Sequence, residues 1–169
     1  MEPTFNILLI GDNKVGKTTF VEKCKSGRYV KQYYHTSECV TTHLEFHTNK
    51  GLAVVYVTEC DLGTPIPDMD FQAVIIMFSV TSMKSYKAIA SSEVYNTCKS
   101  ISPNMILCGN KVDCKREVGE GVHRSMFKCD RKMPYVEISA KNDYNFEKLF
   151  IRVLRPLMGF DTVFAGRSE

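Results

Sequence analysis

The 169-residue sequence predicts an α/β fold, in which helices cover both faces of a mostly parallel six-stranded sheet with one antiparallel edge strand. Short apolar runs alternate with helix-like stretches, which is the pattern of parallel strands joined by helical crossovers. The runs are continuous, as expected for strands that are buried on both faces. Only the stretch 40–47 alternates more. It leads through a turn at 48–51 into the next run, which predicts a hairpin.

The apolar runs and the helical spacing give the bounds of each expected element. Strands are expected at Phe5–Ile10, Val40–His47, Leu52–Val57, Ala73–Val80, Met105–Cys108 and Tyr135–Ile138. Helices are expected at Lys17–Ser26, Met83–Ser100, Glu120–Asp130 and Asn145–Met158. No repeat, low-complexity segment or linker divides the chain, so residues 1–169 are expected to form a single domain.

The composition is that of an ordinary globular domain, with a net charge of +3 that is too small to indicate nucleic-acid binding. The seven cysteines are scattered and include no Cys-x-x-Cys pair. Reduced thiols in a cytoplasmic or nuclear protein are therefore the simplest expectation. Separately, we expect the protein to be a monomer. The sequence has no signal-peptide pattern, spanning run, myristoylation glycine or prenylation cysteine, so no membrane anchor is expected.

A Gly-x4-Gly-Lys-Thr motif follows the first strand and opens the first helix, which is the context of a phosphate-binding loop. Glycines let the backbone turn tightly around an anion, and the helix N-terminus adds its partial positive charge. The lysine is expected to neutralise the outer phosphates, and the threonine that follows it to coordinate Mg²⁺. The candidate phosphate-binding residues are Gly11, Asp12, Asn13, Lys14, Val15, Gly16, Lys17, Thr18 and Thr19.

A second motif contains Asn110, Lys111 and Asp113 and follows a strand at its carboxyl end, where ligands bind in such sheets. A carboxylate accepts one hydrogen bond from the ring N–H of guanine and one from its exocyclic amine. Adenine cannot supply that pair, so Asp113 is expected to select guanine. A third motif follows the last strand and is expected to support the base through the backbone N–H of its central residue. Its residues are Ser139, Ala140 and Lys141.

In this order and spacing the three motifs resemble those of the Ras-like small GTPases, a family of P-loop NTPases, over about residues 5–158. Within that family the chain is most similar to Ran, the nuclear-transport GTPase, in stretches such as 46–51, 107–113 and 144–148. The resemblance implies the small-GTPase fold, bound GTP or GDP with Mg²⁺, and a cytoplasmic or nuclear location. It also implies that Tyr29 stacks on guanine and that Thr36, in the first switch, senses Mg²⁺ and the γ-phosphate.

The chain departs from the family at its second switch, where Asp-Thr-Ala-Gly-Gln is replaced by Glu-Cys-Asp-Leu-Gly-Thr-Pro-Ile-Pro at 59–67. No glutamine follows the glycine to orient the attacking water. The nearest catalytic candidates are Gly63 and Thr64, and the acid that faces Mg²⁺ through water is either Asp61 or Glu59. The segment is also several residues shorter than in the family.

A further departure lies in the phosphate loop, where Asn13 and Lys14 replace the family's small residues near the γ-phosphate. Together these features predict a protein that binds guanine nucleotides, hydrolyses GTP very slowly and engages partners in a nucleotide-dependent way. By resemblance to Ran, the partners are transport receptors or Ran-binding domains. The alternative is a pseudo-GTPase interaction module, in which the nucleotide is structural or absent. The sequence leaves open whether the chain is an enzyme.

Overall fold

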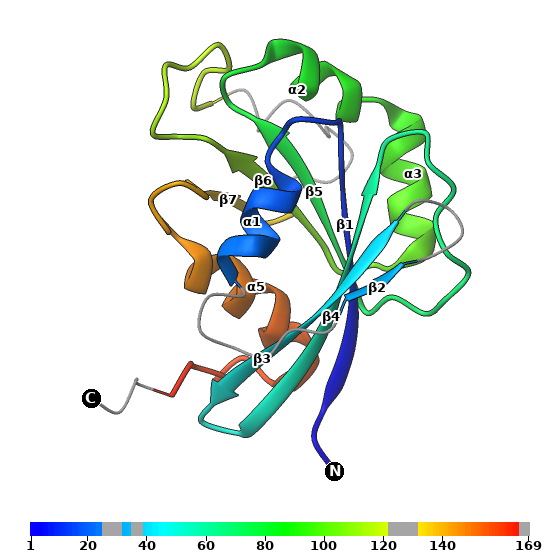
Figure 1. Ribbon diagram of the computed structural model, residues 1–169, viewed down its shortest axis with the longest axis vertical. Coiled ribbons are helices and arrows are strands. Elements are labelled where there is room, and N and C mark those ends of the chain that lie inside the picture. Colours follow the sequence, from blue (N-terminus) through cyan, green and yellow to red (C-terminus); the bar gives the residue numbers. More distant parts are fainter. Residues whose placement is uncertain (25–31, 35–38, 122–131, 166–169) are drawn as a thin grey trace.

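The computed structural model describes residues 1–24, 32–34, 39–121 and 132–165. In it, strands form one sheet in the order β2-β3-β4-β1-β5-β6-β7 (Figure 1). The strands are β1 (Thr4–Gly11), β2 (Gln32–Tyr34), β3 (Val40–Thr48), β4 (Gly51–Asp61), β5 (Ala73–Ser79), β6 (Met105–Asn110) and β7 (Tyr135–Glu137). The described helices are α1 (Lys17–Cys24), α2 (Met83–Ile89), α3 (Ser92–Ile101) and α5 (Phe146–Met158). None of these helices is long and apolar enough to cross a bilayer.

The six expected strands are all present, and β3 runs antiparallel to both of its neighbours. The remaining pairs, from β4 through β1, β5 and β6 to β7, are parallel. The expected antiparallel strand is therefore confirmed, but the prediction that it forms the edge of the sheet is wrong. The short strand β2 pairs with residues 40–42 and takes the edge position. Three residues are too few to show a hydrophobic period, which is why the sequence did not predict β2.

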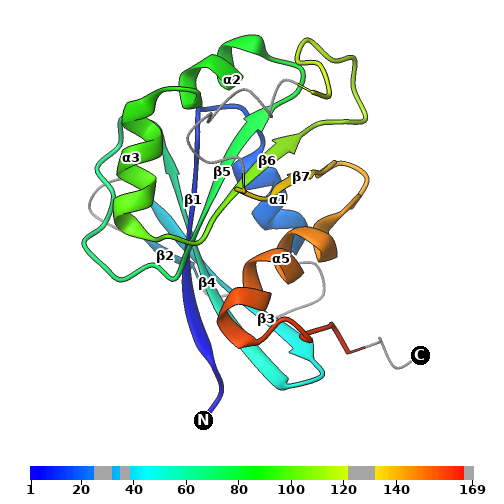
Figure 2. The ribbon, with the colours of Figure 1, turned by 180° about the vertical axis from the view of Figure 1, so that it is seen from behind.

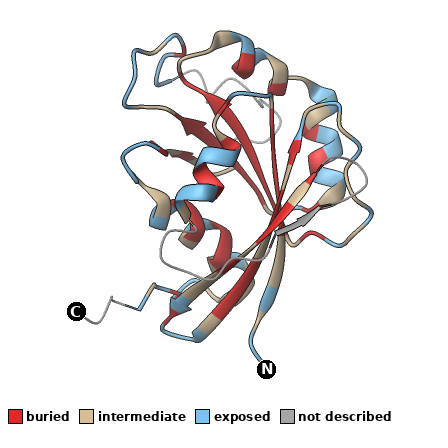
Figure 3. Ribbon diagram, viewed as in Figure 1, coloured by how far each residue is buried: buried red, intermediate tan, exposed pale blue. Residues whose placement is uncertain are grey.

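Alternate residues of the central strands face opposite sides of the sheet, so these strands are buried on both faces (Figure 3). In β1, Ile7 and Leu9 join one core cluster, whereas Leu8 joins the other. Helices α1 and α5 cover the first cluster, and the rings of Phe20 and Phe150 stack there with centroids 5.5 Å apart. Helices α2 and α3 contribute to the second cluster. In both views α3 lies across the sheet from α1 and α5 (Figures 1 and 2).

The single helix expected at Met83–Ser100 is wrong, because the structure divides it into α2 and α3. Ser91 has an extended backbone between them, and its side chain accepts a hydrogen bond from the backbone N–H of Val94 at 3.2 Å. A serine in this conformation is a strong helix N-cap, so it starts a new helix instead of continuing the old one. Of the helix expected at Glu120–Asp130, residues 120–121 form a turn, and residues 122–130 lie outside the described part.

The expectation of reduced thiols is wrong for two of the seven cysteines, because Cys39 and Cys60 form a disulfide. The pairing of β3 with β4 brings their Cα atoms to 4.8 Å, although the two residues are 21 positions apart in the sequence. Spacing alone gives no sign of this pair, since it depends on the register of the hairpin. Four other cysteines, Cys24, Cys98, Cys108 and Cys114, carry no disulfide.

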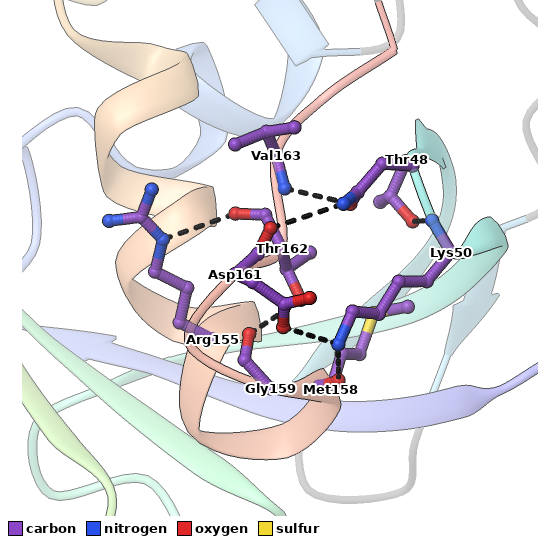
Figure 4. Close-up of polar contacts among 9 residues, drawn as sticks. Thr48, Lys50, Arg155, Met158, Gly159, Asp161, Thr162 and Val163 are labelled. Atoms are coloured by element: carbon purple, nitrogen blue, oxygen red, sulfur yellow. Dashed lines mark hydrogen bonds and ion pairs between the residues drawn. The ribbon is translucent and has the colours of Figure 1, made fainter.

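The chain beyond α5 folds back over the turn between β3 and β4 (Figure 4). Lys50 pairs with Asp161, with the ammonium nitrogen 2.5 Å from the carboxylate oxygen. The Asn49 side chain donates to the backbone carbonyl of Asp161 at 3.1 Å and accepts from the N–H of Val163 at 2.9 Å. These contacts tie the last helix to the closed end of the β3–β4 hairpin.

Candidate functional site

The Gly-x4-Gly-Lys-Thr motif forms the loop that leaves β1 and enters α1, as the sequence predicts. Gly16 has a φ of +99°, and a Cβ atom there would collide with the Asn110 side-chain amide. Any side chain at this position is therefore excluded both by the left-handed backbone and by the neighbouring loop. Lys17 is only 5% exposed, and its ammonium donates to the carbonyls of Gly11 at 2.9 Å and Asp12 at 2.7 Å.

Asn110 joins the second motif to the phosphate loop and to the third motif. Its side-chain N–H donates to the carbonyl of Val15 at 2.9 Å, and its Oδ1 accepts from the N–H of Ala140 at 3.2 Å. The Lys111 ammonium donates to the carbonyl of Lys14 at 2.7 Å. Because Asn110 is completely buried, these bonds fix the relative positions of three loops that are far apart in the sequence.

The Asp113 carboxylate is contacted by two side chains, Ser139 at one oxygen and Cys114 at the other. The Ser139 hydroxyl donates to Asp113 Oδ1 at 2.7 Å, and the Cys114 thiol lies 3.3 Å from Oδ2. The hydrogen bond from Ser139 is the largest cause that lowers the pKa of the Asp113 carboxyl below its ordinary value of 3.8, with a smaller contribution from Cys114. Asp113 therefore stays ionised at neutral pH, as a carboxylate that accepts two hydrogen bonds must.

The three loops surround a pocket of about 470 Å³, which lies within the size range of small-ligand sites. Its lining residues are Asn13, Lys14, Gly16, Lys17, Thr18, Thr19, Asp61, Asn110, Lys111, Asp113, Cys114, Ala140 and Lys141. All but Cys114 are residues that the sequence singled out. Cys114 gave no motif signal, and only its position directly after Asp113 could have drawn attention to it.

Two acidic side chains at the end of β4 reach the phosphate loop. Glu59 accepts a hydrogen bond from the Thr18 hydroxyl at 2.5 Å, and the Asp61 carboxylate lies 2.7 Å from the Lys17 ammonium. Residues two apart in a strand share a face, which is why both reach the same loop. The two candidates for the metal-side acid thus contact different groups. Thr18 with Glu59 forms an oxygen set of the kind that Mg²⁺ prefers.

Residues 62–72 connect the end of β4 to β5 and include most of the second switch; this second-switch segment is hydrogen-bonded to the rest of the fold at both of its ends. The N–H of Leu62 donates to the carbonyl of Gly11 at 3.1 Å, and the N–H of Gln72 donates to the carbonyl of Asn6 at 2.8 Å. Between them, Ile66 and Met69 are partly buried against the second core cluster. This packing, together with the two backbone hydrogen bonds, holds the shortened segment against the core.

Gly63, Thr64 and Val15, which the sequence also singled out, are not among the residues that line the pocket described above. Gly63 has a φ of +85° and lies in the turn at the start of the second-switch segment, and Thr64 follows it. Val15 is buried in the core beneath the phosphate loop. Tyr29 and Thr36 lie outside the described residues.

A model of the Ras family matches residues 6–158, which is most of the chain. The matched region begins in β1, before the phosphate loop, and ends with α5, so it contains all three motifs and all of the described sheet except the start of β1. The motifs, the pocket between them and this match agree: the chain belongs to the Ras family of small GTP-binding proteins.

Proposed function

We propose that this chain binds GTP and GDP together with Mg²⁺, hydrolyses GTP very slowly and binds its partners through the nucleotide-bound form. The observation that carries the proposal is the Asn110 side chain, which bonds both the phosphate loop and the third motif. It holds Lys17 and Asp113 at one pocket, where they serve the two ends of a single ligand. A phosphate chain and a guanine base are the two groups that these side chains suit.

Different residues are proposed to bind the phosphates, the base and the metal ion of the nucleotide. The carbonyls of Gly11 and Asp12 hold Lys17 at the phosphate loop, where the β- and γ-phosphates would share or replace Asp61 as the partner of its charge. Asp113, oriented by Ser139, accepts from the guanine edge. The contact between Thr18 and Glu59 supports Glu59 as the acid on the metal side. A bound Mg²⁺ would supply charge neutralisation between the phosphates.

The residues in the place of the family's glutamine, Gly63 and Thr64, support the proposal of slow hydrolysis. Gly63 and Thr64 do not line the pocket. Gly63 has no side chain, and Thr64 lacks the amide with which a glutamine orients the attacking water. Even an intact Ras-type centre hydrolyses GTP only at about 10⁻⁴ s⁻¹ without a partner. Asn13 lines the pocket from the phosphate loop, where it crowds the approach of a partner's arginine.

The proposed partners are transport receptors or Ran-binding domains, in nucleocytoplasmic transport. The resemblance to Ran in residues 46–51 and 107–113 supports this role. Because the second-switch segment is attached through Leu62 and Gln72, we expect partner affinity to depend less on the nucleotide than in a full switch. Titrations with GDP and with a non-hydrolysable GTP analogue should differ by less than about 10³-fold, or about 4 kcal/mol.

One observation favours a second candidate, a pseudo-GTPase interaction module. The cation and the hydroxyl of the phosphate loop are both satisfied by the chain's own carboxylates, Lys17 by Asp61 and Thr18 by Glu59. Because its charged groups are paired within the chain, the empty pocket carries a smaller electrostatic penalty, so a bound ligand should add less to the stability of the fold. Melting of nucleotide-stripped protein, with and without GDP and Mg²⁺, separates the two candidates. No rise in melting temperature would favour the module.

Nucleotide competition tests the main proposal. Displacement of a fluorescent GDP analogue should rank GTP and GDP above ATP by a factor on the order of 10⁴, because adenine leaves the carboxylate unpaired. Asp113→Asn should move the preference from guanine toward xanthine, whose carbonyl accepts from the new amide. Asp143→Asn, the same change at an exposed carboxylate outside the pocket lining, is the matched control. Equal affinity of the wild type for ATP and GTP would end the proposal.

A further inference from the structure

The disulfide between Cys39 and Cys60 closes the open end of the β3–β4 hairpin. The hairpin's register runs from Val40 opposite Glu59 to Thr48 opposite Gly51, where the turn is. The disulfide follows directly after the pair at the open end, so it acts as a covalent last rung. At the closed end, the hairpin is held by the contact of Lys50 with Asp161 (Figure 4).

Cys60 stands between the two acidic residues that reach the phosphate loop. Glu59 contacts Thr18 and Asp61 contacts Lys17, whereas Cys60 belongs to the core cluster on the opposite face of β4. The disulfide therefore lies on the face of β4 opposite to Glu59 and Asp61, at the residue between them. Both carboxylates that contact the phosphate loop are therefore direct sequence neighbours of a disulfide cysteine.

The two cysteines are not held equally by the rest of the fold. Cys60 lies inside β4, and its neighbour across the sheet is Ile10 of the central strand β1. Cys39 precedes β3, and the pairing on this side begins only with Val40 opposite Glu59. The start of β3 is also paired with β2, so the disulfide is the link that ties Cys39 itself to β4. Without the disulfide, this end of the hairpin beside Glu59 would lose its covalent closure.

The surroundings of Cys39 would also accommodate its reduced form. Cys39 is completely buried, and its Sγ lies 3.6 Å from the carbonyl oxygen of Pro65 in the second-switch segment. In the dithiol form the Cys39 S–H would have this carbonyl as an acceptor. Reduction would thus leave the buried Cys39 thiol with an acceptor already in place.

We propose that Cys39 and Cys60 form a reversible redox site that sets how tightly the chain holds guanine nucleotide. This inference rests on the proposed nucleotide binding. The oxidant is a small disulfide such as oxidised glutathione. One cysteine sulfur attacks it and releases a first small thiol, and the second cysteine then displaces the other. The pair loses two electrons and two protons, which the oxidant takes up as two thiols. The oxidised chain keeps Glu59 beside Thr18 and releases nucleotide slowly.

Linkage makes the effect reciprocal, which gives a readout that does not depend on hydrolysis. If the oxidised chain binds GDP more tightly than the reduced chain, GDP favours the disulfide by the same factor. We expect a factor of about ten, within the usual range of coupling between two sites. For a two-electron couple, tenfold corresponds to about 30 mV, so GDP should make the midpoint potential more negative by that amount.

The experiment measures release of a fluorescent GDP analogue from the full chain, with Mg²⁺, in glutathione buffers of graded ratio. Alkylation of the unfolded protein followed by peptide mass measurement reports the Cys39–Cys60 bond in each buffer. The comparison is the wild type oxidised and reduced, because this needs no substitution in the core. Cys39→Ala with Cys60→Ala should release quickly in every buffer, and Cys24→Ser should behave as the wild type.

The expected result is release that becomes about tenfold faster as the bond opens, together with the shift in midpoint caused by GDP. Equal release rates in the two redox forms would overturn the inference while leaving nucleotide binding intact. Absence of the Cys39–Cys60 peptide at every glutathione ratio would overturn it as well. If GDP binds neither form, the proposed function fails and the inference fails with it.

Discussion

Lys17 of the phosphate loop and Asp61 at the end of β4 form an ion pair, with the ammonium nitrogen 2.7 Å from the carboxylate oxygen. The lysine is almost fully buried, whereas the aspartate side chain is 54% exposed. A phosphate that enters the loop must therefore share or replace the carboxylate as the partner of Lys17. Two residues earlier, Glu59 holds the Thr18 hydroxyl, so the two acids have separate partners.

Neutralising each acid should separate their roles. Asp61→Asn removes a competitor for Lys17, so GDP affinity measured in EDTA should rise severalfold above the wild type. Glu59→Gln removes the charge next to Thr18, so GDP affinity should lose most of its dependence on Mg²⁺. Calorimetric titration with GDP, in Mg²⁺ and in EDTA, measures both effects. The reverse result, with Mg²⁺ dependence lost in Asp61→Asn and kept in Glu59→Gln, would assign the metal-side acid to Asp61.

Removing the Ser139 hydroxyl should change the pH dependence of guanine binding. The pKa of Asp113 lies below 3.8, so the carboxylate and its bonds to guanine are present above that range and are lost as the pH falls through the pKa. In Ser139→Ala the largest lowering cause is gone, so the pKa rises and affinity for GDP should fall at a higher pH than in the wild type. GDP affinities between about pH 7 and pH 4 test this.

The control for this profile is Cys114→Ser, which keeps a donor beside the other Asp113 oxygen. Its profile should follow that of the wild type. Identical profiles for Ser139→Ala and the wild type would show that Ser139 does not set the charge state of Asp113.

Restoring the missing glutamine alone should rescue little hydrolysis. In Thr64→Gln the new side chain starts from a turn that is closed by a hydrogen bond from the N–H of residue 64 to the carbonyl of Asp61, at 3.1 Å in the wild type. Pro65 and Pro67 follow and restrict the backbone that must carry it. Single-turnover rates should increase by less than about tenfold over the wild type, against the roughly 10⁵-fold that a complete centre gains with its partner. A wild-type rate equal to that of an intact Ras-type centre would contradict the interpretation of this segment.

The contact between Lys50 and Asp161 should stabilise the fold in a pH-dependent way. The hydrogen bond from Lys50 lowers the pKa of Asp161 below 3.8, so its contribution is present above that value and is lost as the pH falls through the lowered pKa. Asp161→Asn should lower the melting temperature slightly at pH 7, and the difference from the wild type should shrink toward pH 3. Asp143→Asn, at another exposed carboxylate, should show a smaller difference at both pH values.

Much of the site could be predicted from the sequence because its parts are local. The phosphate loop is one continuous stretch between a strand and a helix, and its glycine, lysine and threonine act through their immediate backbone. Asp113 likewise follows its strand directly, and parallel strands place their carboxyl ends at one edge. The continuous apolar runs also predicted the buried strands β1, β5 and β6, since such runs need cover on both faces, although the run at Tyr135–Ile138 forms the edge strand β7.

The tertiary structure alone decided which distant groups meet. The register of β3 on β4 joins Cys39 to Cys60, and the course of β4 past the phosphate loop gives Glu59 to Thr18 and Asp61 to Lys17. Strand β2 and the fold-back after α5 were likewise invisible to periodicity, because one is three residues long and the other is an irregular segment. Hydrophobic pattern specifies which residues are buried and loop motifs specify local backbone shape. A pairing between side chains on different elements is set only when the strands take their register.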